Sequence, residues 1–66
     1  MSRLRDYRKS LGLTQREVGY MLGVRQSTVA MWETGANKVN VDALKKLASL
    51  YSCKVDDLLE ADYGSM

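Results

Sequence analysis

The stretch from residue 13 to residue 35, LTQREVGYMLGVRQSTVAMWETG, decides how this chain folds. Its apolar residues recur every three or four positions, which is typical of α-helices, and they do not alternate as they would in a half-buried strand. Thr14 and Glu17 have the spacing of a capping box, in which the threonine oxygen accepts from the amide three residues on and the glutamate reaches back. The stretch therefore predicts a helix that begins directly after Thr14.

Two glycines predict how the next helix is joined to this one. Gly23 stops this helix and supplies a turn of about four residues, which is too short for two antiparallel helices, so this helix and the next must cross steeply as a helix-turn-helix. Gly19 has no side chain, so the next helix can approach closely, which offsets the cost of a glycine inside a helix. Five apolar residues are expected to fill the angle between the helices: Val18, Leu22, Val24, Val29 and Trp32.

Outward from this stretch the pattern remains helical. A helix over residues 2–10 is expected to end at Gly12, with Leu4, Tyr7 and Leu11 on its apolar face, and Met21 joins Val18 and Leu22 in the apolar stripe of the second helix. After a loop at residues 35–40, Asn40 is a good N-cap for a fourth helix. That helix carries Leu44, Leu47, Ala48 and Tyr51. A short fifth helix is expected to carry Val55, Leu58 and Leu59, and the tail at residues 61–66 to fray.

The composition limits the chain to one small domain, expected over residues 1–60 of the 66. With one cysteine and no histidine, the chain has no internal disulfide and no ordinary zinc site. Cys53 is expected to be an inert core thiol rather than a redox sensor. No apolar run approaches the length of a membrane span and no apolar signal core follows the N-terminus, so we expect a cytoplasmic protein.

The charges are unevenly distributed along the chain. Residues 1–40 carry seven basic and three acidic side chains, whereas residues 41–66 carry three basic and five acidic ones. A basic front and an acidic back suit an encounter with a polyanion on one side, although mixed charge on an ordinary solvated surface looks much the same.

Taken in order, these features resemble the phage-repressor/Cro-type (XRE-like) helix-turn-helix domains over residues 3–60. The resemblance rests on Leu13-Thr14-Gln15, on the spacing of Gly19 and Gly23, and on the segments VRQSTV at 24–29, WETG at 32–35, LKKLA at 44–48 and VDDLL at 55–59. It implies an all-α, compact five-helix bundle of the lambda-repressor-like type. The third helix of such a bundle enters the DNA major groove by its N-terminal end, usually as a dimer on a palindrome.

The outward face of the third helix is expected to contact bases. The candidates are Arg25, Gln26, Ser27 and Met31. A glutamine can bond adenine N6 and N7 together, an arginine can bond guanine O6 and N7, and an apolar side chain can touch a thymine methyl. Arg25 departs from the Ser or Thr usual in the family at this N-cap, so it weakens the cap and adds a long cation. Each residue could instead be an ordinary solvated side chain.

Other residues are expected to contact phosphate or to support the fold. The phosphate candidates are Gln15, Arg16, Thr28, Asn37 and Lys38. Gln15 matches a family position at a helix N-terminus, where unpaired amides favour an anion. By the same resemblance, Arg8 and Glu33 form an ion pair that fixes the third helix, and Trp32 is a core residue rather than a platform for base stacking.

The resemblance implies a DNA-binding transcriptional regulator, most simply a repressor that occupies a palindromic operator. An enzyme is not expected, because the chain has no histidine, no glycine-rich phosphate loop and no inward carboxylate pair. Neither a cofactor, a metal nor a small-molecule ligand is expected. The alternative is a protein-interaction module on the same fold, such as an antirepressor or a toxin-neutralising partner. A homodimer would use Leu58, Leu59, Tyr63 and Met66, some of which would instead be core.

Overall fold

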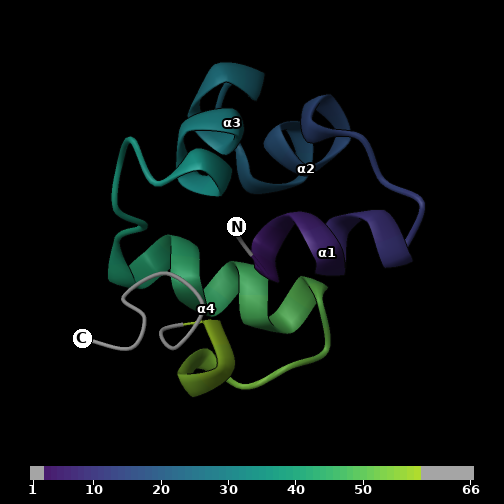
Figure 1. Cartoon of the computed structure of the whole chain (residues 1–66), viewed down its shortest axis with the longest axis vertical. Coiled ribbons are helices and arrows are strands. Elements are labelled where there is room, and N and C mark those ends of the chain that lie inside the picture. The colour runs from purple at the N-terminus through teal and green to yellow at the C-terminus, as the bar shows by residue number, and fades with distance from the viewer. Residues whose placement is uncertain (1–2, 59–66) are drawn as a thin grey trace.

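The computed structural model describes residues 3–58, and these residues form an all-helical bundle without strands. The helices are α1 (Arg3–Ser10), α2 (Gln15–Leu22), α3 (Gln26–Thr34) and α4 (Val41–Leu50). A further helical segment covers residues 55–58, the last of the described residues. In Figure 1, α2 and α3 lie together at one end of the molecule, α4 lies toward the other end, and α1 lies between them. The expected all-α fold is confirmed.

The ends of the helices follow the local signals in the sequence. Thr14 Oγ1 accepts from the Glu17 amide at 3.0 Å, and Glu17 Oε1 accepts from the Thr14 amide at 2.9 Å, so the predicted capping box is present. Gly23 ends α2 in the left-handed region with a φ of 75°. Asn40 Oδ1 accepts from the Ala43 amide at 2.8 Å and caps α4, as expected.

Gly19 sets how closely α2 approaches the turn that leads into α3. A β-carbon built at Gly19 would lie 2.7 Å from the carbonyl oxygen of Val24 and 3.3 Å from the amide nitrogen of Gln26. The carbonyl of Gly19 also accepts from the Val24 amide at 2.8 Å. The backbone of the turn therefore lies directly on the backbone of α2, as the sequence predicted, and a side chain at position 19 would separate them.

The core lies between the four helices, where α2 packs against α3 and α4, and α1 packs against α3. Four of the five residues predicted to fill the angle of the helix-turn-helix are buried, namely Val18, Leu22, Val29 and Trp32, whereas Val24 is only partly buried and packs against the core. Trp32 is 4% exposed, so it is a packing residue. Leu58 is fully buried, so it belongs to the core and not to a dimer surface. The other three residues of the expected dimer surface, Leu59, Tyr63 and Met66, and the expected tail at 61–66, lie outside the described residues.

Two residues expected on apolar faces are instead exposed, and those expectations were wrong. Leu11 is 51% exposed because α1 ends at Ser10, so Leu11 lies in the turn beyond the helix. Met21 is 54% exposed because the buried stripe of the short helix α2 consists of Val18, Gly19 and Leu22. Three-residue spacing alone thus overestimated the width of the buried face.

Aromatic residues join α1 to the end of α4. The rings of Tyr7 and Tyr51 stack with centroids 5.8 Å apart, and a side-chain hydrogen bond joins Tyr7 to Cys53. Burial raises the pKa of the Tyr51 hydroxyl to about 12 and also raises the pKa of the Cys53 thiol above its usual value. A protonated, half-buried thiol packed against the core fits the expected inert role of Cys53.

A buried ion pair ties α1 to the end of α3. Arg8 Nε donates to Glu33 Oε2 at 2.7 Å and Arg8 Nη2 donates to Glu33 Oε1 at 3.1 Å, while Arg8 Nη1 donates to the Leu13 carbonyl at 2.9 Å. The two side chains are 10% and 4% exposed. The bonds to Glu33 raise the pKa of the Arg8 guanidinium. The pair that the resemblance implied is thus present, in bidentate form.

None of the helices described in residues 3–58 is long and apolar enough to cross a membrane.

Gly19→Val should lower the free energy of unfolding by about 1–3 kcal/mol, because the added side chain pushes the backbone of the turn away from α2. Chemical denaturation monitored by circular dichroism measures this effect. Tyr20→Val is the matched control, because Tyr20 is the next residue of α2 and is 88% exposed. Equal stability of the two variants would contradict the close approach at Gly19.

Arg8→Met should destabilise the fold by about 3–5 kcal/mol, because it leaves the Glu33 carboxylate buried without its partner. The double variant Arg8→Met/Glu33→Leu should regain most of that loss, because it removes both charges and fills the space with apolar groups. Denaturant unfolding of the two variants and the wild type makes the comparison. A double variant less stable than Arg8→Met alone would contradict the cost assigned to the unpaired Glu33 carboxylate, and the difference between the double variant and the wild type gives the net contribution of the pair.

Candidate nucleic-acid interface

The beginning of α3 forms an exposed ridge. Arg25, at the N-cap, has an extended backbone and makes no side-chain cap hydrogen bond. Arg25, Gln26 and Ser27 are exposed, and Met31 is half-buried one turn further along. The first amides with a partner are those of Thr28 and Val29, which donate to the Arg25 carbonyl, so the amides of Gln26 and Ser27 point out of the helix without a partner in residues 3–58. The ridge therefore presents amide donors, polar side chains and a cation.

A line of hydrogen bonds holds the side chain of Gln26. Its Nε2 donates to Gln15 Oε1 at 3.0 Å, and Gln15 Nε2 donates to Glu33 Oε1 at 3.1 Å. Because Glu33 also accepts from Arg8, the line runs from the exposed start of α3 to the buried pair at its end. All four residues were predicted from the sequence as site or ion-pair residues, but the network that joins them was not predicted. The steep crossing predicted from Gly19 and Gly23 was the available signal, since it places the first turns of α2 and α3 side by side.

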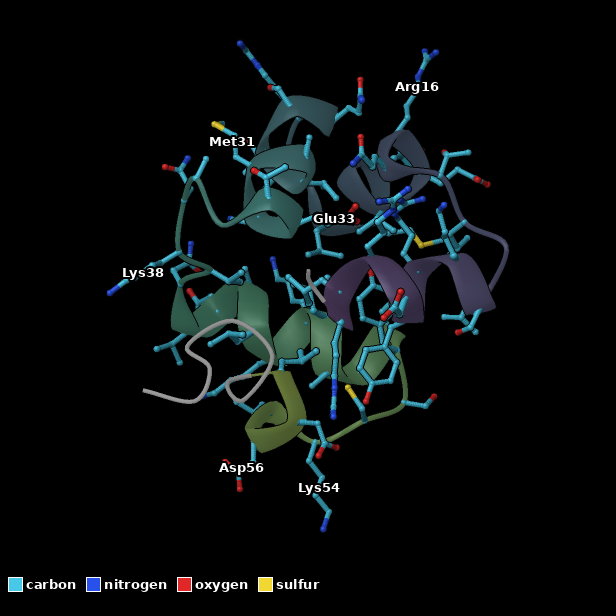
Figure 2. The ribbon with its side chains drawn as sticks, viewed as in Figure 1. Arg16, Met31, Glu33, Lys38, Lys54 and Asp56 are labelled. Atoms are coloured by element: carbon cyan, nitrogen blue, oxygen red, sulfur yellow. The ribbon has the colours of Figure 1, made fainter. Side chains whose placement is uncertain are left out.

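The N-terminus of α2 is a second place that suits an anion. The capping box and the Thr14 carbonyl supply partners for the amides of Thr14, Glu17 and Val18, and no partner in residues 3–58 accepts from those of Gln15 and Arg16. Free amides and the positive end of the helix dipole both favour negative charge. The Arg16 side chain is exposed and points outward from α2 (Figure 2).

The loop after α3 places the remaining candidates. The Asn37 amide donates to the Met31 carbonyl at 3.3 Å, and Asn37 Nδ2 approaches Met31 Sδ at 3.4 Å, so Asn37 lies against the last turns of α3. Lys38 points away from the body of the molecule (Figure 2). Thr28 is half-buried, unlike the two residues before it. Asn37 and Lys38 therefore flank the ridge, and Thr28 lies deeper than the other candidates.

The charges near the ridge favour a polyanion. Glu33, the one acid of α3, is buried on the inner side of the helix, where its carboxylate accepts hydrogen bonds from Arg8 and Gln15. The outer face of α3 therefore presents no carboxylate. Figure 2 shows Glu33 between α3 and α1, whereas Arg16 and Met31 point outward. Asp56 lies at the opposite end of the molecule from α3 in the same view. The cations that adjoin the ridge are thus Arg25, at the N-cap of α3, and Arg16, in the first turn of α2.

Comparisons with known proteins agree with this geometry. A helix-turn-helix family model matches residues 4–58. An uncharacterized HTH-type transcriptional regulator of Archaeoglobus fulgidus is 30% identical over 61 residues, which cover 92% of this chain and 87% of that protein. No solved structure gives a significant match.

Two longer regulators are also similar. Repressor protein C2 of Salmonella phage P22 is 33% identical over 60 residues, and the HTH-type transcriptional activator BcrR of Enterococcus faecalis is 28% identical over 60 residues. Each match covers 91% of this chain, but only 28% of the repressor and 29% of the activator. The matched residues span the described helices almost completely. The chain therefore belongs to the helix-turn-helix family of transcriptional regulators, in its XRE/Cro/C1-type branch.

Proposed function

We propose that this protein regulates transcription by placing the start of α3 in the major groove of an operator. The observation that carries the proposal is the hydrogen bond that Gln26 Nε2 donates to Gln15 Oε1, because it holds an exposed side chain in place. A side chain already held in place loses less conformational entropy when it binds. A purely structural role does not explain a polar network that ends at the most exposed part of the helix.

After its hydrogen bond to Gln15, the Gln26 side chain still has the donor and the acceptor that are needed to recognise adenine. A glutamine amide has two N–H donors and an acceptor oxygen, and the bond to Gln15 uses one donor. The remaining N–H and the oxygen match adenine N7 and N6. Arg25, Ser27 and Met31 are the other proposed base contacts, with Arg25 directed to guanine and Met31 to a thymine methyl.

Phosphate contacts would set the position of the ridge in the groove. We assign them to Gln15 and Arg16 at the start of α2, to Thr28, and to Asn37 and Lys38 in the loop after α3. Contacts on two sides of α3 would bracket the base contacts and fix their register on the duplex. Arg8 and Glu33 hold Gln15 and α3 in place and do not themselves contact DNA in this proposal.

Repression is the physically simplest way in which a bound domain could regulate transcription. A domain seated on promoter DNA excludes polymerase, so we propose repression by occupancy of the operator. One of the similar regulators is named a repressor and another an activator, so likeness alone favours neither. We place this activity in the cytoplasm, where the chromosome of a bacterium, an archaeon or a resident phage lies.

A second candidate function has its own observation. Tyr20 and Met21 are exposed side by side on α2, with exposed fractions of 88% and 54%. Neighbouring exposed apolar side chains suit a protein partner, as in an antirepressor or a toxin-neutralising module. The two functions differ in salt dependence: DNA affinity that falls steeply with added salt favours the regulator, and no DNA affinity at low salt favours the interaction module.

Gln26→Ala should weaken binding to the cognate site by about 1–3 kcal/mol and leave binding to random DNA nearly unchanged, because only base contacts are lost. Gln15→Ala should weaken binding to both DNAs, and more to the cognate site, because it removes a phosphate contact and the support of Gln26. Sites selected from random DNA at fixed salt supply the cognate sequence, and titration measures both affinities. Lys45→Ala, on the exposed side of α4, is the control. Equal losses on both DNAs for Gln26→Ala would remove Gln26 from the base contacts.

Two copies of the chain should bind a palindrome whose half-site centres lie about 10 bp apart, one turn of the duplex. A single domain makes few contacts, and joining two raises the effective concentration of the second at its half-site. Sedimentation of the protein with selected DNA measures the stoichiometry, and insertion of about 5 bp between the half-sites should abolish paired binding. A monomer on its cognate site would contradict the dimer.

A further inference from the structure

A cavity of about 350 Å³ opens between α1, the start of α2 and the end of α3. Gln15 lines it from α2 and Thr34 lines it from the last turn of α3. None of the proposed base contacts lines this cavity, and three of them, Arg25, Gln26 and Ser27, lie at the other end of α3; the remaining proposed phosphate contacts also lie outside it. The cavity is thus next to the proposed interface but is not part of it.

The cavity has more positive than negative charge on its walls. Arg8 and Glu33 both line it, but their charges are paired with each other. Arg5 and Lys9 also line it, and neither forms an ion pair within residues 3–58. They lie four residues apart on α1, so their side chains emerge on the same face of the helix. Asp6 is the one unpaired acid among the lining residues, which leaves a net positive charge.

The position of the cavity decides which part of a duplex could reach it. Its α2 wall carries Gln15, whose backbone N–H has no partner in residues 3–58 and lies where the proposed interface takes a phosphate. A duplex that presents base edges to Gln26 can bring only its sugar-phosphate strand past Gln15 toward α1, because the base edges stay inside the groove. Guanidinium and ammonium groups both bind phosphate oxygens well, and bridging waters can fill the remaining space.

We propose that Arg5 and Lys9 bind a backbone phosphate of the DNA that flanks the half-site, with this cavity as the pocket for that phosphate. The inference rests on the proposed function and extends it: α1 lengthens the stretch of DNA that each domain covers. The contact is independent of base sequence, because only phosphate oxygens reach the cavity. It therefore adds affinity and salt dependence, and it requires DNA beyond the bases contacted by α3.

The test compares the variants Arg5→Gln, Lys9→Gln and the double variant with the wild-type chain. Binding to a selected site with long flanks is measured from about 50 to about 200 mM salt. Each lost phosphate contact should reduce the slope of log affinity against log salt by about 0.9, so the affinity ratio across this range falls roughly threefold per contact. Arg3→Gln is the matched control, because it removes a cation of the same helix that does not line the cavity. Arg5→Lys keeps the charge and should keep the wild-type slope.

A second arm shortens the DNA. With flanks trimmed back to the contacted bases, the wild type and the double variant should bind equally, because the phosphate that α1 reaches is gone. Unchanged melting temperatures would show that the variants are folded. Wild-type slopes in the double variant on long DNA would overturn the inference while leaving the regulator intact, whereas no DNA binding by the wild type would overturn the proposed function itself. Saturable binding of inorganic phosphate together with an unchanged DNA slope would make the cavity a site for free anions and would also overturn the inference.

Discussion

The rest of the structure depends on the hydrogen bonds and the ion pair that the Glu33 carboxylate forms. It lies on the inner side of α3, accepts two bonds from Arg8 of α1, and accepts a third from Gln15 of α2. Three helices thus share one buried charge. A carboxylate removed from water needs such partners, because an unpaired one would cost several kcal/mol. The same need fixes the rotation of α3, since only one face of the helix can bring Glu33 to both partners.

This rotation determines what α3 presents to solvent. With Val29, Trp32 and Glu33 buried, the opposite side carries Arg25, Gln26 and Ser27. The burial of Glu33 also removes the only acid of α3 from the outer face, so the structural role of this residue and the electrostatics of the ridge have one cause. Gln15 then carries the constraint outward, because its amide bonds Glu33 on one side and Gln26 on the other. The buried pair and the proposed contact to a base are therefore mechanically connected.

The small size of the domain explains why polar groups are used in this way. A chain of 66 residues buries only about 60% of its unfolded surface, and this one has no internal disulfide to restrain it. Short helices of eight to ten residues also have narrow buried faces, which is why Met21 of α2 remains exposed. Caps, a bidentate ion pair and close backbone contact at Gly19 supply orientation that a larger core would supply by packing alone.

The sequence by itself determined the helices, their ends and the close approach at Gly19, because these depend on local chemistry: the capping box at Thr14 and Glu17, the left-handed turn at Gly23 and the missing side chain at Gly19 are each complete within a few residues. It also indicated which residues of α3 face outward, and through the family resemblance it indicated the Arg8–Glu33 pair. The tertiary structure alone decided that Gln15 joins that pair to Gln26, that Leu58 is core, and that Arg5 and Lys9 line one cavity with Gln15. These contacts connect residues that are far apart in the chain. The packing of the helices alone sets the distances between such residues, and the periodicity and spacing of the sequence carry no information about those distances.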